Sequence, residues 1–323
     1  LRSGQLDMTS ATAMYLANPT KVALRGKGSY GSEDPEDGGQ YGLKLSWFLP
    51  ELNDTEVALY HLNYHSRRPI ISGITSDFRD AALGADLTRI ASGEINESNV
   101  NELQAFTKAV LVFPEDIKAY AFSFNTAIGT TAVAGEYTFR QDEPLQIDDV
   151  ELLFAAMPQQ LADPAVNDAF RRDDLTNISQ MVDANGNAYG SGVRADGFYK
   201  SDTSQAQVTF TQLFGPTIGA SQFTGLLEIG GVWIHDLPSE DVLRLNAPGT
   251  SQNGGIAGKE GLEIGLQGGV ETNPFPDDFS WGYRLVAKLD YNDVFAGINV
   301  SPRVVFSHDV KGTTPDPMFL FVE

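Results

Sequence analysis

The chain of 323 residues is 41% hydrophobic, carries a net charge of -21 and contains no cysteine. This composition supports a packed structure, while the lack of cysteine excludes disulfides and thiolate metal sites and the acidic charge disfavours nucleic-acid binding. The sequence has no run of about 18 apolar residues, which excludes a transmembrane helix.

Eight segments alternate between apolar and polar residues, as expected of a strand with two different faces. In chain order they are residues 41–48, 56–65, 117–126, 131–140, 204–212, 222–234, 280–291 and 298–307. In segment 280–291, Trp281, Tyr283 and Leu285 fall on one face, and Arg284 falls on the other. Each segment is close to the roughly 9–11 residues that a tilted strand needs to cross a bilayer. The alternation therefore predicts transmembrane strands with a lipid-facing and a water-facing side.

The water-facing side is expected to carry the functional residues, because charges cannot face hydrocarbon cheaply. The candidate lining residues are Lys44, His61, Asn63, His65, Glu136, Arg140, Glu228, Arg284, Lys288, Asp290 and Arg303. In segment 56–65 this assignment places Tyr60 and Leu62 on the lipid side. The charges either contact a solute or pair with one another and only stabilise the wall. Their mixed sign disfavours a strongly ion-selective pore.

The connections between the segments are alternately short and long. The short ones are residues 49–55, 127–130, 213–221 and 292–297, and the long ones are residues 66–116, 141–203 and 235–279. This alternation is typical of an outer-membrane barrel with tight periplasmic turns and large extracellular loops. Loops of this length need structure of their own, and we expect helices at residues 77–91, 99–110 and 147–158.

The predicted fold is all-β: one antiparallel transmembrane β-barrel domain spanning residues 1–323, located in the bacterial outer membrane and in contact with the bilayer and lipopolysaccharide. In this barrel the chain would enter its first strand, and leave its last strand, on the extracellular side, where the long connections lie. Because open sheet edges do not survive in lipid, we expect the barrel to be incomplete at both ends, with at least one further strand at each.

Catalytic and metal chemistry find little support, and we expect no enzyme activity, no cofactor and no metal. His61 and His65 are spaced to share a metal on one strand face, but the sequence offers no third ligand. The run 307–309 reads Ser-His-Asp, but neighbouring strand residues point to opposite faces and cannot form a triad. The segment 183–187 favours a polar turn over a calcium loop, because its glycine and acidic positions do not fit.

Five stretches resemble the DUF1302 family of Gram-negative envelope proteins, which is grouped with membrane β-barrels. They are ELNDTEVALYHLNYHSRRPIISG (51–73), FPEDIKAYAFSFNT (113–126), GEYTFRQDEPLQIDDVELLFAA (135–156), QAQVTFTQLFGP (205–216) and SWGYRLVAKLDYNDVFAGINVSPRVVFSHDVKGTTP (280–315). The resemblance covers most of residues 41–315. It implies export or uptake of hydrophobic compounds, beside an RND-type transporter and a DUF1329 protein, and it brings no catalytic residues.

We therefore expect an outer-membrane channel or transporter for small hydrophobic compounds, which pass through a polar-lined lumen gated by extracellular loops. Two other hypotheses stay open. One is an outer-membrane lipid hydrolase with His61 or His65 as the base, and the other is a soluble secreted β-sandwich that binds a ligand.

Overall fold

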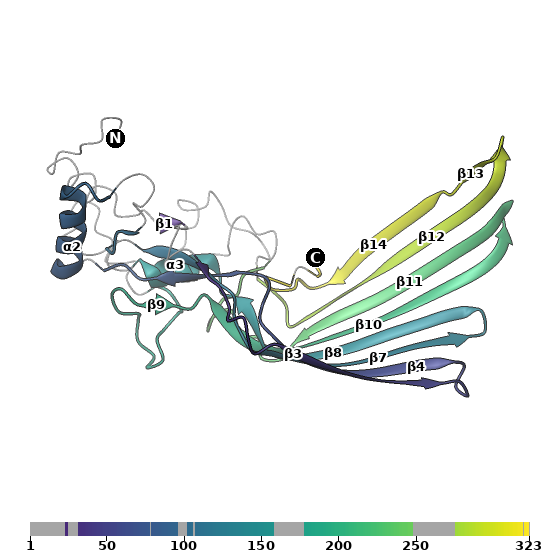
Figure 1. The fold of residues 1–323 in the computed structure, drawn as a ribbon, viewed down its shortest axis with the longest axis horizontal. Helices are drawn as coiled ribbons and strands as arrows, with labels where there is room; N and C mark the ends of the chain where they lie inside the picture. Colours follow the sequence, from purple (N-terminus) through teal and green to yellow (C-terminus); the bar gives the residue numbers. More distant parts are fainter. Residues whose placement is uncertain are drawn as a thin grey trace.

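A computed structural model describes residues 23–24, 32–77, 79–95, 102–105, 107–157, 178–247, 275–318 and 320–322. The described chain forms a long antiparallel sheet with a smaller folded unit, here called the cap, at one end (Figure 1).

The long sheet has nine strands. The first seven follow one another in chain order across the sheet, and the last two both pair with the seventh. The nine strands are β3 (Tyr41–Leu49), β4 (Thr55–Tyr64), β7 (Ile117–Ile128), β8 (Thr131–Gln146), β10 (Phe198–Thr217), β11 (Ala220–Ile234), β12 (Phe279–Phe295), β13 (Ile298–Val300) and β14 (Arg303–Lys311). The eight segments expected from the sequence coincide with these strands. The last segment is divided into β13 and β14 around Pro302, which has no N–H to donate to a ladder.

The short and long connections lie at opposite ends of the sheet (Figure 1). Each short turn contains a residue with positive φ, namely Asp54, Gly129, Gly219 or Gly297. Such residues are those that tight turns between antiparallel strands require. The long connections and the part of the chain before β3 build the cap, which lies at one end of the sheet only.

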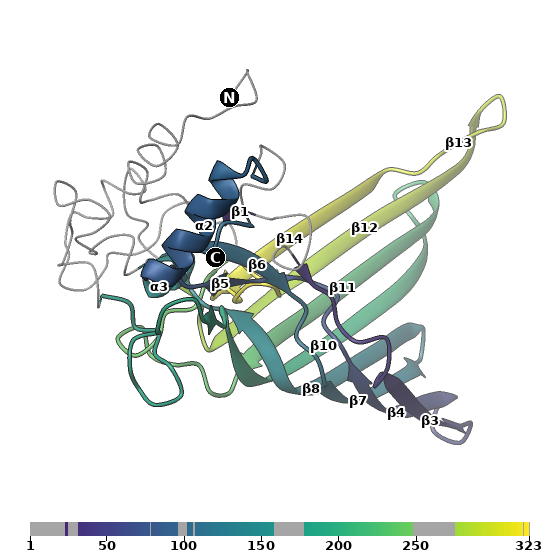
Figure 2. The ribbon, with the colours of Figure 1, turned by 60° about the vertical axis from the view of Figure 1, so that its left-hand side comes forward.

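The cap contains a second sheet and two helices (Figure 2). Its elements are β1 (Ala23–Leu24), β2 (Ser32–Glu33), β5 (Ile70–Ile74), β6 (Lys108–Val112), β9 (Arg194–Ala195), α2 (Asp80–Ala91) and α3 (Asp149–Ala156). The helices α2 and α3 match two of the expected helices. The expectation of a helix over residues 99–110 was wrong in its described part, because Lys108 begins a strand whose valines favour extended backbone.

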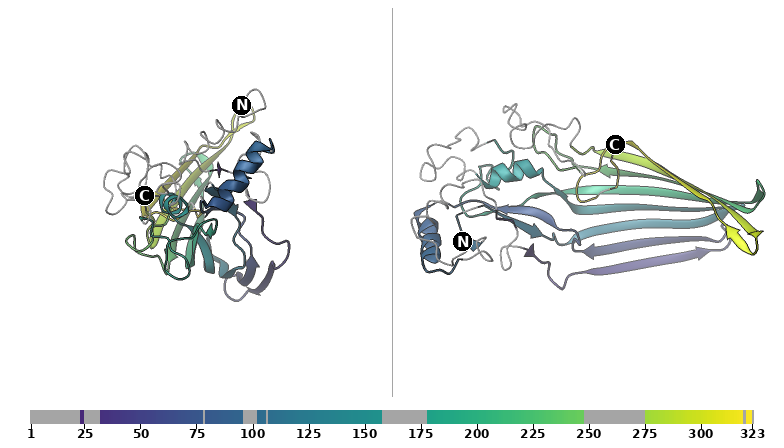
Figure 3. Two further views of the ribbon diagram at one scale, coloured as in Figure 1. Left: turned by 90° about the vertical axis from the view of Figure 1, so that its left-hand side faces the viewer. Right: turned by 90° about the horizontal axis from the view of Figure 1, so that it is seen from above.

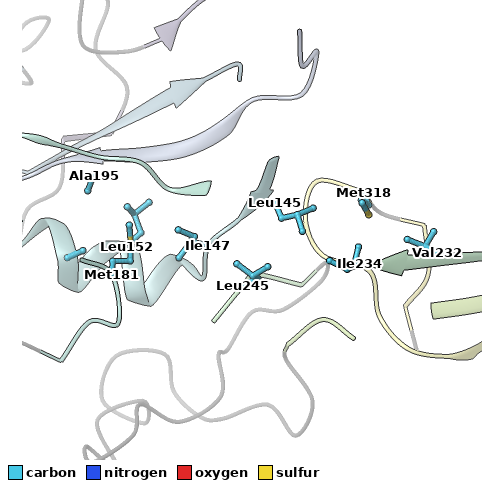
Figure 4. Close-up of a cluster of buried hydrophobic side chains, with 10 residues drawn as sticks. Leu145, Ile147, Leu152, Met181, Ala195, Val232, Ile234, Leu245 and Met318 are labelled. Atoms are coloured by element: carbon cyan, nitrogen blue, oxygen red, sulfur yellow. The ribbon is translucent and has the colours of Figure 1, made fainter. Parts of the chain in front are cut away.

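The main hydrophobic core lies where the cap meets the long sheet. It joins Leu152 of α3 and Leu145 of β8 to Val232 and Ile234 of β11 and to Met318 after β14 (Figure 4). Leu145 is fully buried. Packing therefore anchors the cap end of the sheet, while the rest of the sheet extends beyond this core (Figure 3).

The strand register divides the long sheet into two faces, because paired residues on neighbouring strands share a face. Here the apolar face is the side of Trp47, Phe122, Tyr137 and Leu285, and the polar face is the side of Lys44, Glu136, Thr209 and Arg284. All three tryptophans of the chain, Trp47, Trp233 and Trp281, lie on the apolar face.

Both faces are open to the surroundings over most of their length. Leu285 is 42% exposed and Phe122 is 41% exposed on the apolar face. In the described part of the chain no second layer covers either face, and the outer strands β3 and β14 do not pair with each other. The structure thus has the expected antiparallel all-β character, in an open sheet. Among the described helices, neither is long and apolar enough to span a membrane.

Candidate functional site

The polar face carries rows of hydrogen-bonding and charged side chains that cross several strands. In one row Thr209 lies opposite Glu228, and Glu228 lies opposite Arg284. The Thr209 hydroxyl donates to Oε2 of Glu228 over 3.3 Å. Such rows place groups of both signs next to one another along the sheet.

Most of the expected lining residues lie on this face. They are Lys44, Glu136, Arg140, Glu228, Arg284, Lys288, Asp290 and Arg303. Some of them pair locally: the amino and carboxylate groups are 3.9 Å apart in Lys44–Glu56 and 2.8 Å apart in Lys288–Asp290. Within the described residues, Arg284 and Arg303 are exposed and make no ion pair. Ion pairing that stabilises the sheet therefore explains only some of the charged residues on the polar face.

The assignment of His61 and Asn63 to the polar face was wrong. His61 pairs with Leu43 and with Tyr120, so it lies on the apolar face. Its ring stacks on Tyr120 at a centroid distance of 4.7 Å and meets Tyr41 edge-on at 5.7 Å. The residues expected on the lipid side of β4 are instead on the polar face, where the ammonium of Lys44 lies 5.4 Å from the centre of the Tyr60 ring.

His65 was also expected in the lumen wall, but it is buried and serves as a structural link. Its Nδ1 accepts from the backbone N–H of Asp116 over 3.1 Å, which leaves Nε2–H to donate to the carbonyl of Gly38 over 2.7 Å. The amide of Asn63 donates to the carbonyl of Gly39 and to Oδ1 of Asp116, both at 2.9 Å. These two side chains fasten the entry to β3 onto the start of β7.

A cavity of about 770 Å³ lies on the polar face at its cap end. One wall comes from β4 and β7 and is mainly apolar: it consists of Leu62, Ile117, Ala119 and Ala121 with the rings of Tyr60 and Tyr64. The adjoining wall comes from β8 and β10 and is polar: Glu136, Thr138, Arg140 and Gln205. The register places Ala119 directly beside Arg140, and Ala121 beside Thr138. Apolar and polar surfaces therefore meet along the line between β7 and β8.

The third side of the cavity is made by residues that follow β4 and β14. They are Ser66, Arg67, Arg68, Pro317, Met318 and Leu320. The guanidinium of Arg68 donates to the carbonyl of Pro317 and, over 3.1 Å, to that of Met318. This contact joins the two sides of the open sheet above its polar face. Nothing in the sequence spacing of 250 residues indicates it.

Sequence reasoning also missed a hydroxyl–imidazole contact on the apolar side of the cap end. Oγ of Ser204 lies 2.7 Å from Nε2 of His235 and 2.9 Å from the hydroxyl of Tyr137. Ser204 is buried. The pair resembles a nucleophile and its base, but a buried hydroxyl cannot meet a substrate, so the contact supports packing rather than hydrolysis.

The other motifs behave as polar structure. Oδ1 of Asp183 accepts from the N–H groups of Asn185 and Asn187, which is a tight polar turn. Ser307 and His308 pair with Arg284 and Tyr283 and so lie on opposite faces, which excludes a triad at residues 307–309. Among the residues that the structure describes, no cluster of three potential ligands could hold a metal ion.

Fold and site together define a β-rich protein built on one large antiparallel sheet, with a capped, amphipathic cavity on its polar face. A family model with the description "Protein of unknown function (DUF1302)" matches residues 8–323. The chain belongs to this DUF1302 family, which confirms the resemblance found in the sequence. Neither the curated proteins nor the solved structures contain a match to the chain.

Proposed function

We propose that the long sheet forms the wall of a transmembrane β-barrel channel in the bacterial outer membrane. In this proposal the apolar face contacts lipid and the polar face lines a passive route for small hydrophobic compounds. The observation that carries the proposal is the uncovered apolar face. It runs across the whole sheet and exposes Leu43, Leu45, Trp47, Leu59, Tyr120, Phe122, Tyr137, Phe210, Ile229, Leu285, Val304 and Phe306.

A water-soluble antiparallel sheet covers one of its faces with a packed layer. Soluble monomers rarely leave connected apolar patches larger than a few hundred Å². A β-sandwich would need a second sheet on this face, and none of the described strands provides one. Lipid is the surrounding in which such a face needs no cover.

The strand lengths agree with this environment. β7 has 12 residues, β8 has 16 and β12 has 17, compared with the roughly 9–11 that a tilted strand needs in a bilayer. The proposal places the short turns in the periplasm and the cap at the cell surface. It also requires pairing partners for the outer strands β3 and β14, because unpaired edges are not stable in hydrocarbon.

The cavity supports a gated route rather than a wide pore. It lies on the polar face, directly under the segments that Arg68 joins. A solute entering from the cap side would meet this cavity before the rest of the polar face. Lipopolysaccharide would surround the cap, and an RND-type transporter system, which the family resemblance implies, is the proposed partner.

The hydrolase hypothesis gains no support from the histidines on which it depended. His61 stacks on Tyr120 and meets Tyr41 edge-on, and both ring nitrogens of His65 are hydrogen-bonded to backbone groups. We therefore propose transport and no catalytic step.

Planar-bilayer recordings with the purified full chain test the proposal. We expect conductance with weak ion selectivity, because the polar face carries both signs of charge. Arg284→Glu should shift the reversal potential in a salt gradient toward cation selectivity. The control Arg79→Glu makes the same charge change in the cap at an exposed arginine and should shift it much less. No conductance, or equal shifts for the two variants, would contradict the proposal.

A second readout uses the solute class itself. Gram-negative cells that produce the full chain should take up the hydrophobic dye 1-N-phenylnaphthylamine faster than cells without it. Equal uptake would argue against passage of hydrophobic compounds, even if ions are conducted.

A further inference from the structure

The cavity has walls of opposite character, which restricts the shape of any molecule that fills it. Leu62, Ala119 and Ala121 form an apolar surface on β4 and β7, flanked by the rings of Tyr60 and Tyr64. Thr138, Arg140 and Gln205 stand on the next two strands. A purely apolar molecule would leave the polar wall without hydrogen-bond partners. A purely polar molecule would lose its own hydrogen bonds to water against the apolar wall. The complementary ligand is amphipathic.

The size of the cavity agrees with a small molecule. About 770 Å³ lies within the range of roughly 300–1,000 Å³ that is usual for small-molecule sites. Met318 and Leu320, which follow β14, also border the cavity and add further apolar surface. An alkyl chain can therefore lie between the sheet and this segment.

The charge of the lining indicates the sign of the polar group. Arg67, Arg68 and Arg140 line the cavity together with two carboxylates, Glu136 and Glu143. The hydroxyls of Thr203 and Thr138 donate to Glu143 and Glu136, at 2.5 and 3.1 Å, which satisfies part of the acceptor capacity of these carboxylates. This surplus of positive charge contrasts with the chain as a whole, which carries -21.

Arg140 is the best-placed of the three arginines to bind an anion. Its two terminal nitrogens both donate to the neutral Oε1 of Gln205, over long contacts of 3.3 Å. Its Nε lies 4.0 Å from Glu143, and the hydroxyl of Tyr64 also contacts its guanidinium. A guanidinium has five N–H donors and binds a carboxylate through two parallel hydrogen bonds. Exchange of the Gln205 contact for an anionic group would strengthen both bonds.

We propose that this cavity binds an amphipathic monoanion, with its carboxylate or similar head group on Arg140 and its alkyl chain on the β4–β7 wall. The inference deepens the proposed function, since the cavity lies on the proposed route, and it defines one class of solute. Arg67, at the exposed edge of the cavity, attracts the anion as it enters.

Isothermal titration with the full chain in neutral detergent tests the site through three ligands of equal chain length. Octanoate should bind at least about tenfold more tightly than octyltrimethylammonium, with 1-octanol between them. Arg140→Gln should remove this preference, while Arg140→Lys should retain part of it, because it keeps the charge but loses the planar fork. Arg79→Gln, in the cap, should leave all three affinities unchanged.

Two results would overturn the inference: equal or reversed affinities for octanoate and the ammonium compound, or a preference that survives in Arg140→Gln. Because Arg140 lies in a strand, Arg67→Gln provides a second variant at an exposed position, and it should slow octanoate association. The titration needs no bilayer. Octanoate binding without conductance would contradict the proposed channel and support the anion site. Conductance without a head-group preference would support the channel and contradict the anion site.

Discussion

Arg68 donates a hydrogen bond of 3.1 Å to the backbone carbonyl of Met318, and this bond links two segments that lie 250 residues apart in the chain. One segment follows β4, and the other follows β14 at the opposite side of the sheet. Because both segments border the cavity, this side chain joins two sides of the cavity at the cap end of the polar face.

Arg68→Ala should therefore loosen the segment around residues 315–322 without unfolding the sheet. A hydrogen bond from a charged donor contributes about 1.5–3 kcal/mol when buried, and less at a partly exposed site such as this one. Hydrogen exchange measured by mass spectrometry should show faster exchange in residues 315–322. Arg67→Ala, at the neighbouring position, should not have this effect. Unchanged exchange in the Arg68 variant would show that the contact does not hold the segment.

Replacement by phenylalanine should affect stability in opposite ways at His61, within β4, and at His65, just after it. Nδ1 of His61 is buried and, within the described residues, has no hydrogen-bond partner. His61→Phe removes this unsatisfied atom from an aromatic environment, so thermal stability in detergent should stay equal or rise. His65→Phe loses two backbone contacts and should lower the free energy of unfolding by about 1–3 kcal/mol. Greater damage from His61→Phe would contradict the face that the structure gives this residue.

The eight long segments could be located from the sequence because each one alternates over its whole length. Their faces could also be assigned wherever one side is clearly apolar, as in β12, where Leu285 and Arg284 separate cleanly. The assignment failed in β4, since apolar residues such as Leu59 and Tyr60 occupy both of its faces. The apolar wall of the cavity lies on the polar face of β4, and periodicity alone could not predict which residues of β4 lie on that face.

Only the register could decide between the two faces of β4, and a shift of one residue exchanges them. The hairpin pairs Leu49 with Thr55 around a turn that contains Asn53 and Asp54 with positive φ. The cap was harder still to predict, because β5 and β6 pair within one long connection, and α3, which packs against β5, comes from another. Contacts between distant segments, such as Arg68 with Met318, leave no local pattern.

Two glycines of the cap differ in the space around them and provide a matched pair of variants. A Cβ on Gly197 would lie 1.8 Å from the carbonyl oxygen of Ile71, which is a backbone atom and cannot turn away. Gly197→Ala should destabilise the cap by about 3 kcal/mol or more. A Cβ on Gly84 of α2 meets no atom within 4 Å, so Gly84→Ala should stabilise the helix by about 0.5–1 kcal/mol.

Limited proteolysis of the cap, followed over a denaturant series, measures both changes. The expected order of resistance is Gly84→Ala, then the natural chain, then Gly197→Ala. Equal resistance of the two variants would contradict the close approach of Gly197 to β5.

The stability of the cap should depend on the protonation of Asp148. Its carboxylate caps α3 by accepting from the N–H groups of Val150 and Glu151, and burial raises its pKa from 3.8 to about 7. The folded state therefore binds this proton more tightly than the unfolded state. The stabilisation is fully present below about pH 4 and is lost as the pH rises through about 7.

Asp148→Asn tests this dependence, because asparagine keeps the capping oxygen but cannot titrate. Between about pH 4 and 7 the natural cap should lose stability relative to the variant, by at most about 4 kcal/mol at 1.4 kcal/mol per pKa unit. Thermal unfolding of both proteins across this range gives the difference. Parallel pH profiles would contradict the shift in the pKa of Asp148.

The central claim is that the apolar face meets lipid and the polar face meets water, and neighbouring single cysteines test it most directly. The chain contains no cysteine, so labelling has no background. Leu285→Cys and Leu59→Cys, labelled with a fluorophore in proteoliposomes, should be quenched by brominated lipid. Arg284→Cys and Tyr60→Cys should instead react with a water-soluble maleimide and escape lipid quenching. Equal quenching of the 284 and 285 labels, or stronger quenching at 60 than at 59, would contradict the account.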